Sequence, residues 1–187
     1  MTTKIKAIIL ISLSVIGYLI QMYFQSRGAE IYQSFLMLYT VNPLSFNISI
    51  ITNGFLHANL LHIGMNMLML YMLSTMFQEK NSKFMTVYIL SLLLSSLFSL
   101  IYVSYISPAF VLGASGAIFG IFSYIFFKLN RQKEFYLNFF IFNIGMVMFG
   151  MNIAWYAHLG GAIAGILYYY YESDIIPKIK RKKMKRI

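Results

Sequence analysis

The sequence of 187 residues contains no cysteine and very few acidic residues. Without cysteine, neither a disulfide framework nor a thiolate metal site can form. The five acidic residues all fall in expected loops or at the ends of apolar segments, and they are Glu30, Glu79, Glu134, Glu172 and Asp174. The centres of the long apolar segments therefore offer no carboxylate for catalysis or metal binding.

Charged residues of either sign are scarce, at 11% of the sequence against 59% hydrophobic residues. The charges form short clusters between apolar runs, and a helix needs roughly 20 mostly apolar residues to cross a bilayer core. This composition predicts an all-α, multi-pass integral membrane protein without a sizeable soluble domain. We expect six spans, near residues 5 to 25, 57 to 77, 84 to 106, 115 to 129, 135 to 151 and 154 to 171.

The basic residues are distributed unevenly between the two sides of this predicted bundle. With six spans, 14 of the 15 lysines and arginines fall on the side of both termini and only Arg27 falls on the other. Basic loops stay in the cytoplasm, so we expect cytoplasmic termini. Seven of these residues lie in the last ten positions, where they are expected to bind anionic lipid. No folded basic surface with interleaved aromatic residues is apparent, so nucleic-acid binding is not expected.

Two other classes of intramembrane enzyme lack their required patterns here. An aspartyl protease needs paired aspartates within its spans, and a zinc protease needs His-Glu-x-x-His, and neither occurs. His57 and His62 are five residues apart, about 140° around a helix, which is a poor spacing for two ligands on one face. We therefore expect no metal and no cofactor.

A few polar residues are expected at membrane depth, where their cost makes them functional candidates. The second, fourth and sixth spans all enter from the outer side. His62 and Asn66 in the second, Ser115 at the start of the fourth and His158 in the sixth therefore share one level. His62 and Asn66 are four residues apart and lie on one helix face.

Two glycine stripes indicate how the fourth and sixth spans meet. Gly161 and Gly165 lie on the same face of the sixth span as His158, and a Gly-x-x-x-Gly pair begins at Gly116, beside Ser115. Small residues of this kind permit close helix packing. Packing the two glycine faces together would bring Ser115 to His158. Taken singly, each feature is also typical of ordinary structural residues.

Three motifs, in this order, resemble those of the rhomboid family of intramembrane serine proteases. Residues 113 to 116 resemble its Gly-x-Ser-Gly nucleophile motif, and residues 157 to 165 resemble its Ala-His-x-x-Gly-x-x-x-Gly base motif. His57, His62 and Asn66 match its His-x-x-x-x-His-x-x-x-Asn pattern. The resemblance implies one membrane-embedded rhomboid domain over residues 1–187. Its core covers about 45–171, its fourth helix is short and central, and residues 172–187 form a basic cytoplasmic tail.

The resemblance also implies a mechanism. Ser115 would be the nucleophile and His158 its general base, without a third acid, and an acyl-enzyme would form and be hydrolysed. The backbone N–H of Ser115 and the side chains of His62 and Asn66 would form the oxyanion hole. Supporting positions would be His57, Gly113, Gly116, Phe119, Gly161 and Gly165, with Phe119 packing on the base.

One departure from the family pattern lies in the first loop, roughly residues 26 to 56, and another is Ser74, where a glycine is common near the end of the second span. Ile48 and Ser49 stand where the family often has a Trp-Arg pair, so we expect the loop to be anchored differently. We also expect the polar stretch 107 to 113 to dip into the bundle, a polar cavity to open outward above Ser115, and residues 149 to 152 to act as a gate.

By resemblance, the substrates would be single-pass transmembrane proteins cleaved near the extracytoplasmic face. We expect the protein to reside in a bacterial plasma membrane. The main alternative is a non-proteolytic rhomboid-like chaperone or assembly factor that binds transmembrane helices, although such relatives usually lack the serine or the histidine. A small-solute transporter would need paired charges or related halves at mid-membrane, and neither is apparent.

Overall fold

The computed structural model describes residues 2–44, 48–78, 81–148 and 152–175. These residues are almost entirely helical, and within them the β structure is confined to an isolated bridge between Val41 and Val111. The all-α class predicted from the sequence is confirmed. The helices in chain order are α1 (Thr3–Ser26), α2 (Ala29–Tyr39), α3 (Ser49–Thr52), η1 (Asn53–Phe55), α4 (Leu60–Met76), α5 (Asn81–Tyr105), α6 (Ser115–Lys128), α7 (Gln132–Met148), α8 (Trp155–Tyr170) and the π-helical η2 (Tyr171–Ile175).

Each of the six predicted apolar segments corresponds to one helix, namely α1, α4, α5, α6, α7 and α8. Among the described residues, α1 and Ser82–Tyr105 of α5 are each long and apolar enough to cross a membrane. The pair Ser49–Phe55 and Leu60–Met76 passes the same test as one span bent by 93°. Helix α6 is apolar but has only 14 residues. Six crossings therefore remain a prediction.

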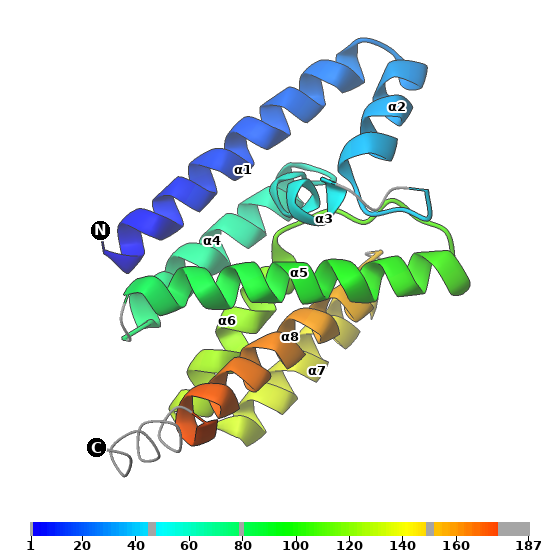
Figure 1. Ribbon diagram of the computed structural model, residues 1–187. Coiled ribbons are helices and arrows are strands. Elements are labelled where there is room, and N and C mark those ends of the chain that lie inside the picture. Colours follow the sequence, from blue (N-terminus) through cyan, green and yellow to red (C-terminus); the bar gives the residue numbers. More distant parts are fainter. Residues whose placement is uncertain (1, 45–47, 79–80, 149–151, 176–187) are drawn as a thin grey trace, which may run out of the picture.

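Helix α6 occupies the centre of the bundle. It packs against α4, α5, α7 and α8, and most of its residues are buried. Figure 1 shows α5 crossing the molecule, with α1 and α2 on one side and α7 and α8 on the other. The start of α1 and the end of α8 lie towards the same side of the view, as an even number of crossings requires.

The outer faces of the bundle carry large apolar side chains. On α7, Leu137 and Phe140 are each 60% exposed, and Ile144 and Val147 are similar. Helices α1 and α5 present comparable rows of exposed isoleucine and leucine. Apolar surfaces this extensive mark a contact with another apolar phase. The exposed faces thus suit lipid, in agreement with the predicted membrane protein.

The backbones of α6 and α8 touch through their glycines. A Cβ atom built on Gly161 would collide with the carbonyl oxygen of Gly116, and one on Gly165 would collide with that of Gly120. The contact follows the glycine spacing seen in the sequence, because only glycine lets two helix backbones approach this closely. It fixes the register between the start of α6 and the start of α8.

Serines of α5 pack on the same α6 glycines. Ser95 lies where a Cβ of Gly116 would be, and Ser91 lies where one of Gly120 would be. The glycines thus admit two neighbouring helices at once, and α6 is enclosed on both flanks.

The first loop contains helices that the sequence analysis did not predict. Helix α2 turns back along the end of α1, where the buried Phe35 stacks on Phe24 with ring centroids 4.7 Å apart. Ser49, at the start of α3, is fully buried, and its carbonyl oxygen accepts a hydrogen bond from Asn53 Nδ2 at 2.6 Å. Here α2 and α3 therefore anchor the loop. These segments of 11 and 4 residues are too short to give a clear helical period.

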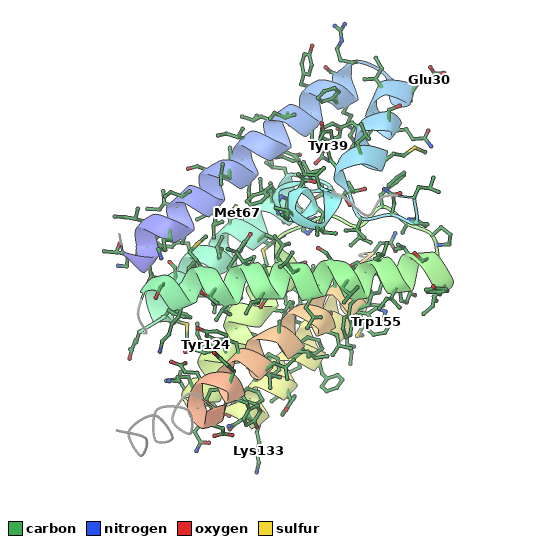
Figure 2. The ribbon with its side chains drawn as sticks, in the orientation of Figure 1. Glu30, Tyr39, Met67, Tyr124, Lys133 and Trp155 are labelled. Atoms are coloured by element: carbon green, nitrogen blue, oxygen red, sulfur yellow. The ribbon has the colours of Figure 1, made fainter. Side chains whose placement is uncertain are left out.

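Three helix ends meet at a charged cluster away from the first loop. Glu172 of η2 bonds Lys83 of α5 and Tyr124 of α6, and Lys128 Nζ lies 3.6 Å from its Oε2. In Figure 2, Tyr124 lies towards one end of the bundle and Trp155 towards the other. The distribution of basic residues predicted that Lys83 and Lys128 lie on the same side of the bundle, and both lie beside Glu172. The predicted basic tail falls mainly on residues 176–187, outside the described residues.

Replacing Gly161 by alanine should destabilise the bundle, because the new Cβ would collide with the backbone of α6. Overpacking of this kind costs about 1–3 kcal/mol. The matched control is Gly145→Ala on α7, where a Cβ would meet nothing within 4 Å. There alanine should leave stability unchanged or raise it by up to about 1 kcal/mol. Thermal unfolding in detergent micelles measures both, and an unchanged midpoint for Gly161→Ala would contradict the backbone contact.

Candidate active site

Ser115 and His158 lie within hydrogen-bonding distance on different helices. Ser115 is the first residue of α6, and His158 lies in the first turn of α8. Ser115 Oγ and His158 Nε2 are hydrogen-bonded at 2.9 Å. The imidazole is 3% exposed, whereas the serine is half-buried and reaches a cavity. The glycine contact between α6 and α8 begins directly beside this pair.

The second ring nitrogen of His158 also has a partner. His158 Nδ1 lies 2.8 Å from Oδ1 of Asn143, a buried residue of α7. Asn143 was not among the polar residues singled out from the sequence at membrane depth, which were His62, Asn66, Ser115 and His158. A polar amide inside an expected span was the available signal.

The segment that leads into Ser115 is held by backbone hydrogen bonds. Val111 and Val41 exchange two of them, at 2.8 and 3.0 Å, and the Gly113 N–H donates to the Asn53 carbonyl at 2.8 Å. The Ala114 N–H faces His57 Nε2 at 3.5 Å. Of the stretch expected to dip into the bundle, residues 107–110 are exposed, Val111 is buried and residues 112–113 are half-buried. These bonds place Ser115 at the helix start, where backbone N–H groups have no intrahelical acceptor.

His57 is fixed by a glutamine that the sequence analysis did not single out. Gln21 of α1 donates from Nε2 to the His57 carbonyl at 3.0 Å and accepts the His57 N–H on Oε1 at 3.1 Å. Both side chains are fully or almost fully buried. Helix α1 therefore supports the turn that holds the segment before Ser115. The available sequence signal was a polar amide, at Gln21, inside an expected apolar span.

His62 and Asn66 of α4 converge on the backbone just before Ser115. A Cβ on Gly113 would lie 2.9 Å from His62 Nε2 and 3.7 Å from Asn66 Nδ2. His62 Nδ1 accepts the Ala58 N–H at 3.4 Å, so in a neutral ring Nε2 carries the proton. Asn66 Nδ2 is buried without a hydrogen-bond partner among the described residues. Two side-chain donors thus point to one region beside the serine.

Phe119 packs on the imidazole, as the resemblance implies. It lies one turn after Ser115, and its ring centroid is 4.5 Å from that of His158, with the planes inclined by 33°. Phe142 of α7 approaches the same imidazole edge-on at 6.1 Å. The two aromatic rings restrict the orientations that the imidazole can adopt.

A cavity of about 390 Å³ reaches Ser115 from between α4, α6 and α7. Asn66 and Ser115 supply polar groups to a wall that is otherwise largely apolar. Neither His62 nor residues 107–113 line this cavity, which faces α7. The polar cavity expected to open outward above the serine stays a prediction. Of the predicted gate at residues 149 to 152, residues 149–151 lie outside the described residues.

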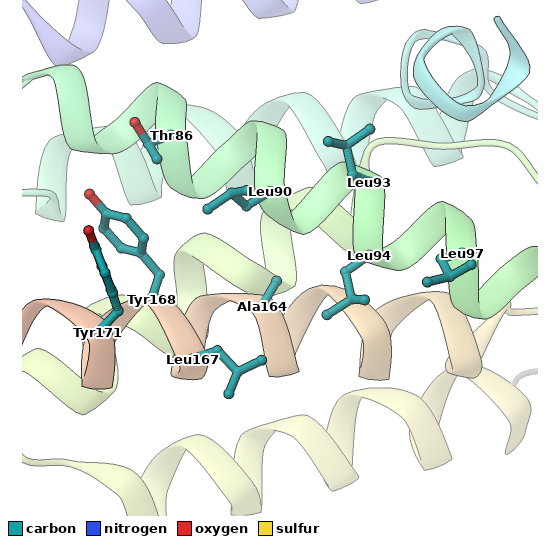
Figure 3. A pocket seen from close by; sticks show the side chains of 9 residues that line it. All are labelled: Thr86, Leu90, Leu93, Leu94, Leu97, Ala164, Leu167, Tyr168 and Tyr171. Carbon is teal, nitrogen blue, oxygen red and sulfur yellow. The ribbon is translucent and has the colours of Figure 1, made fainter. Parts of the chain in front are cut away.

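A larger groove runs between α5 and α8, away from the serine (Figure 3). Leu90, Leu94 and Leu167 form much of its wall, and Tyr168 and Tyr171 close one end. Its surface is almost wholly apolar, and it contains no residue of the candidate site. Such a surface is suited to lipid contact and offers no group for chemistry.

No group of three or more potential metal ligands gathers in the part of the chain that the structure describes. The rings of His57 and His62 do meet edge-on, with centroids 5.1 Å apart. Each ring, however, already turns one nitrogen towards a backbone N–H, at Ala114 and Ala58 respectively. The arrangement supports the segment before Ser115.

Comparison with known proteins gives consistent matches. A family model described as "Rhomboid domain" matches residues 47–175. "Rhomboid protein 1, mitochondrial" of Saccharomyces cerevisiae is 34% identical over 172 residues, covering 79% of this chain and 48% of that protein. "Rhomboid-like protease 3" of Toxoplasma gondii is 29% identical over 145 residues, covering 69% and 54%. The chain spans about half the length of these curated relatives. The expected bacterial plasma membrane finds no support in them and stays a prediction.

Gly113→Ala should displace His62 as well as strain the backbone. Gly113 has φ +126°, and a Cβ there would press on the His62 ring at 2.8 Å. Gly28→Ala is the matched control, because Gly28 has φ +117° with nothing within 4 Å. Both variants should lose about 1–3 kcal/mol through backbone strain, and Gly113→Ala should lose more. Equal losses in thermal unfolding would show that His62 does not contact this backbone.

Proposed function

Because this chain belongs to the rhomboid family of membrane proteins, we propose that it is an intramembrane serine endopeptidase with Ser115 as nucleophile and His158 as base. The observation that carries the proposal is the 2.9 Å hydrogen bond from Ser115 Oγ to His158 Nε2 at the start of α6. A nucleophile and a base within this distance are the signature of an activated serine. The cavity beside Ser115 gives a substrate access to the pair.

The proposed reaction proceeds through an acyl-enzyme. His158 Nε2 takes the proton from Ser115 Oγ as the oxygen attacks the scissile carbonyl carbon. The protonated imidazole then gives this proton to the leaving amine, and the carbon–nitrogen bond breaks. Water, activated by His158, hydrolyses the ester and regenerates the serine.

Three donors are placed to stabilise the developing oxyanion. The Ser115 N–H lies at the N-terminus of α6, where the helix dipole favours negative charge. His62 Nε2 and Asn66 Nδ2 add two side-chain donors from α4. A buried donor without a partner is costly in the resting protein, and it gains one when the oxyanion forms. This supports a catalytic role for Asn66.

The proposed substrates are single-pass transmembrane proteins. The cavity lies between α4 and α7 and has mostly apolar walls, which suits a segment that arrives from lipid. Cleavage requires the substrate helix to open locally, because a helical peptide bond is shielded by its own hydrogen bonds. We place the site near the extracytoplasmic face, with cytoplasmic termini and the basic tail on anionic lipid. The shared location of Lys83 and Lys128 supports this orientation.

Ser115→Ala and His158→Ala should each lower the cleavage rate of a reconstituted single-pass substrate by at least about 10³-fold, because either one removes the nucleophile–base pair. Gel analysis and mass spectrometry of the products measure the rate and the cut. A fluorophosphonate probe should label Ser115 in the wild type and not in His158→Ala.

The matched control for the serine is Ser99→Ala on α5, where the hydroxyl donates to the Ser95 carbonyl of its own helix. This variant should cleave at the wild-type rate. Turnover retained by Ser115→Ala would refute the nucleophile. A folded wild type that binds transmembrane helices without cleaving them would favour the chaperone alternative.

Asn66→Ala should lower kcat and leave KM nearly unchanged, because its amide acts mainly when the oxyanion forms. Loss of one such donor costs on the order of 10²- to 10³-fold. Steady-state kinetics on the same substrate separates the two constants. If KM alone rose, Asn66 would belong to substrate binding and the oxyanion assignment would be wrong.

A further inference from the structure

Asn143 of α7 is the polar residue beside the site to which the proposed mechanism gives no role. Asn143 is 8% exposed. The next residue of the helix, Ile144, is exposed on its outer face. Asn143 Nδ2 donates to the Phe139 carbonyl at 2.8 Å. Because the amide nitrogen is committed to an acceptor, Oδ1 is the atom that faces His158 Nδ1, at 2.8 Å. The orientation of the amide is therefore determined by its hydrogen bonds.

This orientation decides which tautomer His158 adopts. Asn143 Oδ1 can only accept, so Nδ1 must carry the ring proton. In the neutral imidazole, Nε2 is then left with a lone pair facing Ser115 Oγ, as a general base requires. The opposite tautomer would oppose two acceptors across 2.8 Å and would leave the serine without an acceptor on the ring.

We propose that Asn143 is a positioning residue that holds His158 in its base tautomer and fixes the plane of the ring. The inference rests on the proposed function, and it extends the expected serine–histidine dyad to three residues on α6, α8 and α7. A neutral amide performs this role at membrane depth without the desolvation cost of a buried carboxylate. No proton passes to Asn143 during the reaction.

The bond also connects the base to the helix that lines the cavity. Helix α7 packs mainly on α6 and supplies Phe142 and Ile141 to the cavity wall. Asn143 follows Phe142 directly in the sequence. A shift of α7 that admits a substrate would therefore also act on His158 through the amide.

The first test compares variants of Asn143 in the full chain in detergent micelles. Asn143→Leu keeps the branched shape of the side chain and removes the acceptor. It should lower kcat on the order of 10- to 100-fold with little change in KM, which is less than the 10²- to 10⁴-fold contribution of a general base because His158 itself is retained. Asn143→Asp restores an oxygen acceptor and should recover much of this loss. Ile144→Val, on the outward face of α7, should cleave as the wild type does.

The second test reads the tautomer directly, without turnover. The chain has three histidines, so ¹⁵N-histidine NMR gives a simple spectrum in which His158 is assigned by its absence in His158→Ala. The wild type should show a protonated Nδ1 and an unprotonated Nε2, and Asn143→Leu should shift the population towards the other tautomer. A merely structural amide would change the melting temperature without changing this ratio.

The two tests separate this inference from the proposed function. Wild-type His158 with the proton on Nε2 would overturn the inference even if no variant of Asn143 folds. Cleavage by Asn143→Leu at the wild-type kcat would also overturn it and would leave the protease intact. If the wild type shows no cleavage but the tautomer shifts in Asn143→Leu, the protease proposal fails and the positioning role stands.

Discussion

The direct contact between the backbones of α6 and α8 is the constraint on which the candidate site depends. Ser115 has a short side chain and sits at the very start of its helix, so it cannot reach across an ordinary gap between helices. Because Gly161 and Gly165 have no Cβ atom, the backbones of α6 and α8 can come into direct contact. Helix packing in a membrane relies on such fit, because lipid provides little hydrophobic drive for helices to associate. The 2.9 Å bond between Ser115 and His158 follows from it.

Hydrogen bonds to the segment before α6 explain how this central helix can be short. Helix α6 begins within the bundle, so its first N–H groups lack helical partners at a depth where lipid cannot supply any. The preceding segment is fixed by Val41, Asn53 and His57, and Gln21 in turn fixes His57. Three layers of hydrogen bonds, from α1 through the turn before α4 to the loop before α6, thus hold the Ser115 N–H in place for its proposed role.

Sequence alone predicted the features that depend on spacing within one helix. The glycine stripes, the common level of Ser115 and His158 and the shared face of His62 and Asn66 follow from a period of 3.6 residues and from alternating span direction. The helix α2 could not be predicted in this way, because its single buried residue, Phe35, gives no periodic signal. The direction of the cavity depends on how α4 and α7 pack around α6, and spacing within each helix does not specify that packing.

The two amides that hydrogen-bond the histidines of the site were not predicted, for a different reason. Gln21 and Asn143 each contact a histidine that is distant in the sequence, at separations of 36 and 15 residues. Nothing local distinguishes such an amide from one that bonds its own helix, as Asn138 does with the Glu134 carbonyl. Only the three-dimensional arrangement assigns the partner. The site is built from neutral groups, and those outside the recognised motifs, Gln21 and Asn143, were not predicted.

Neutral amides are a physically sound choice for such a site, and their hydrogen bonds sort them by role. A buried charge would carry a large desolvation cost, whereas an amide offers one donor group and one acceptor at a much smaller cost. Gln21 and Asn143 each form hydrogen bonds through both the nitrogen and the oxygen of the amide, and each fixes the position of a histidine. Asn66 differs, because its buried Nδ2 has no partner in the part of the chain described. Amides with both ends bonded hold the two histidines in place, and Asn66, whose donor is open, is the amide that suits the proposed oxyanion.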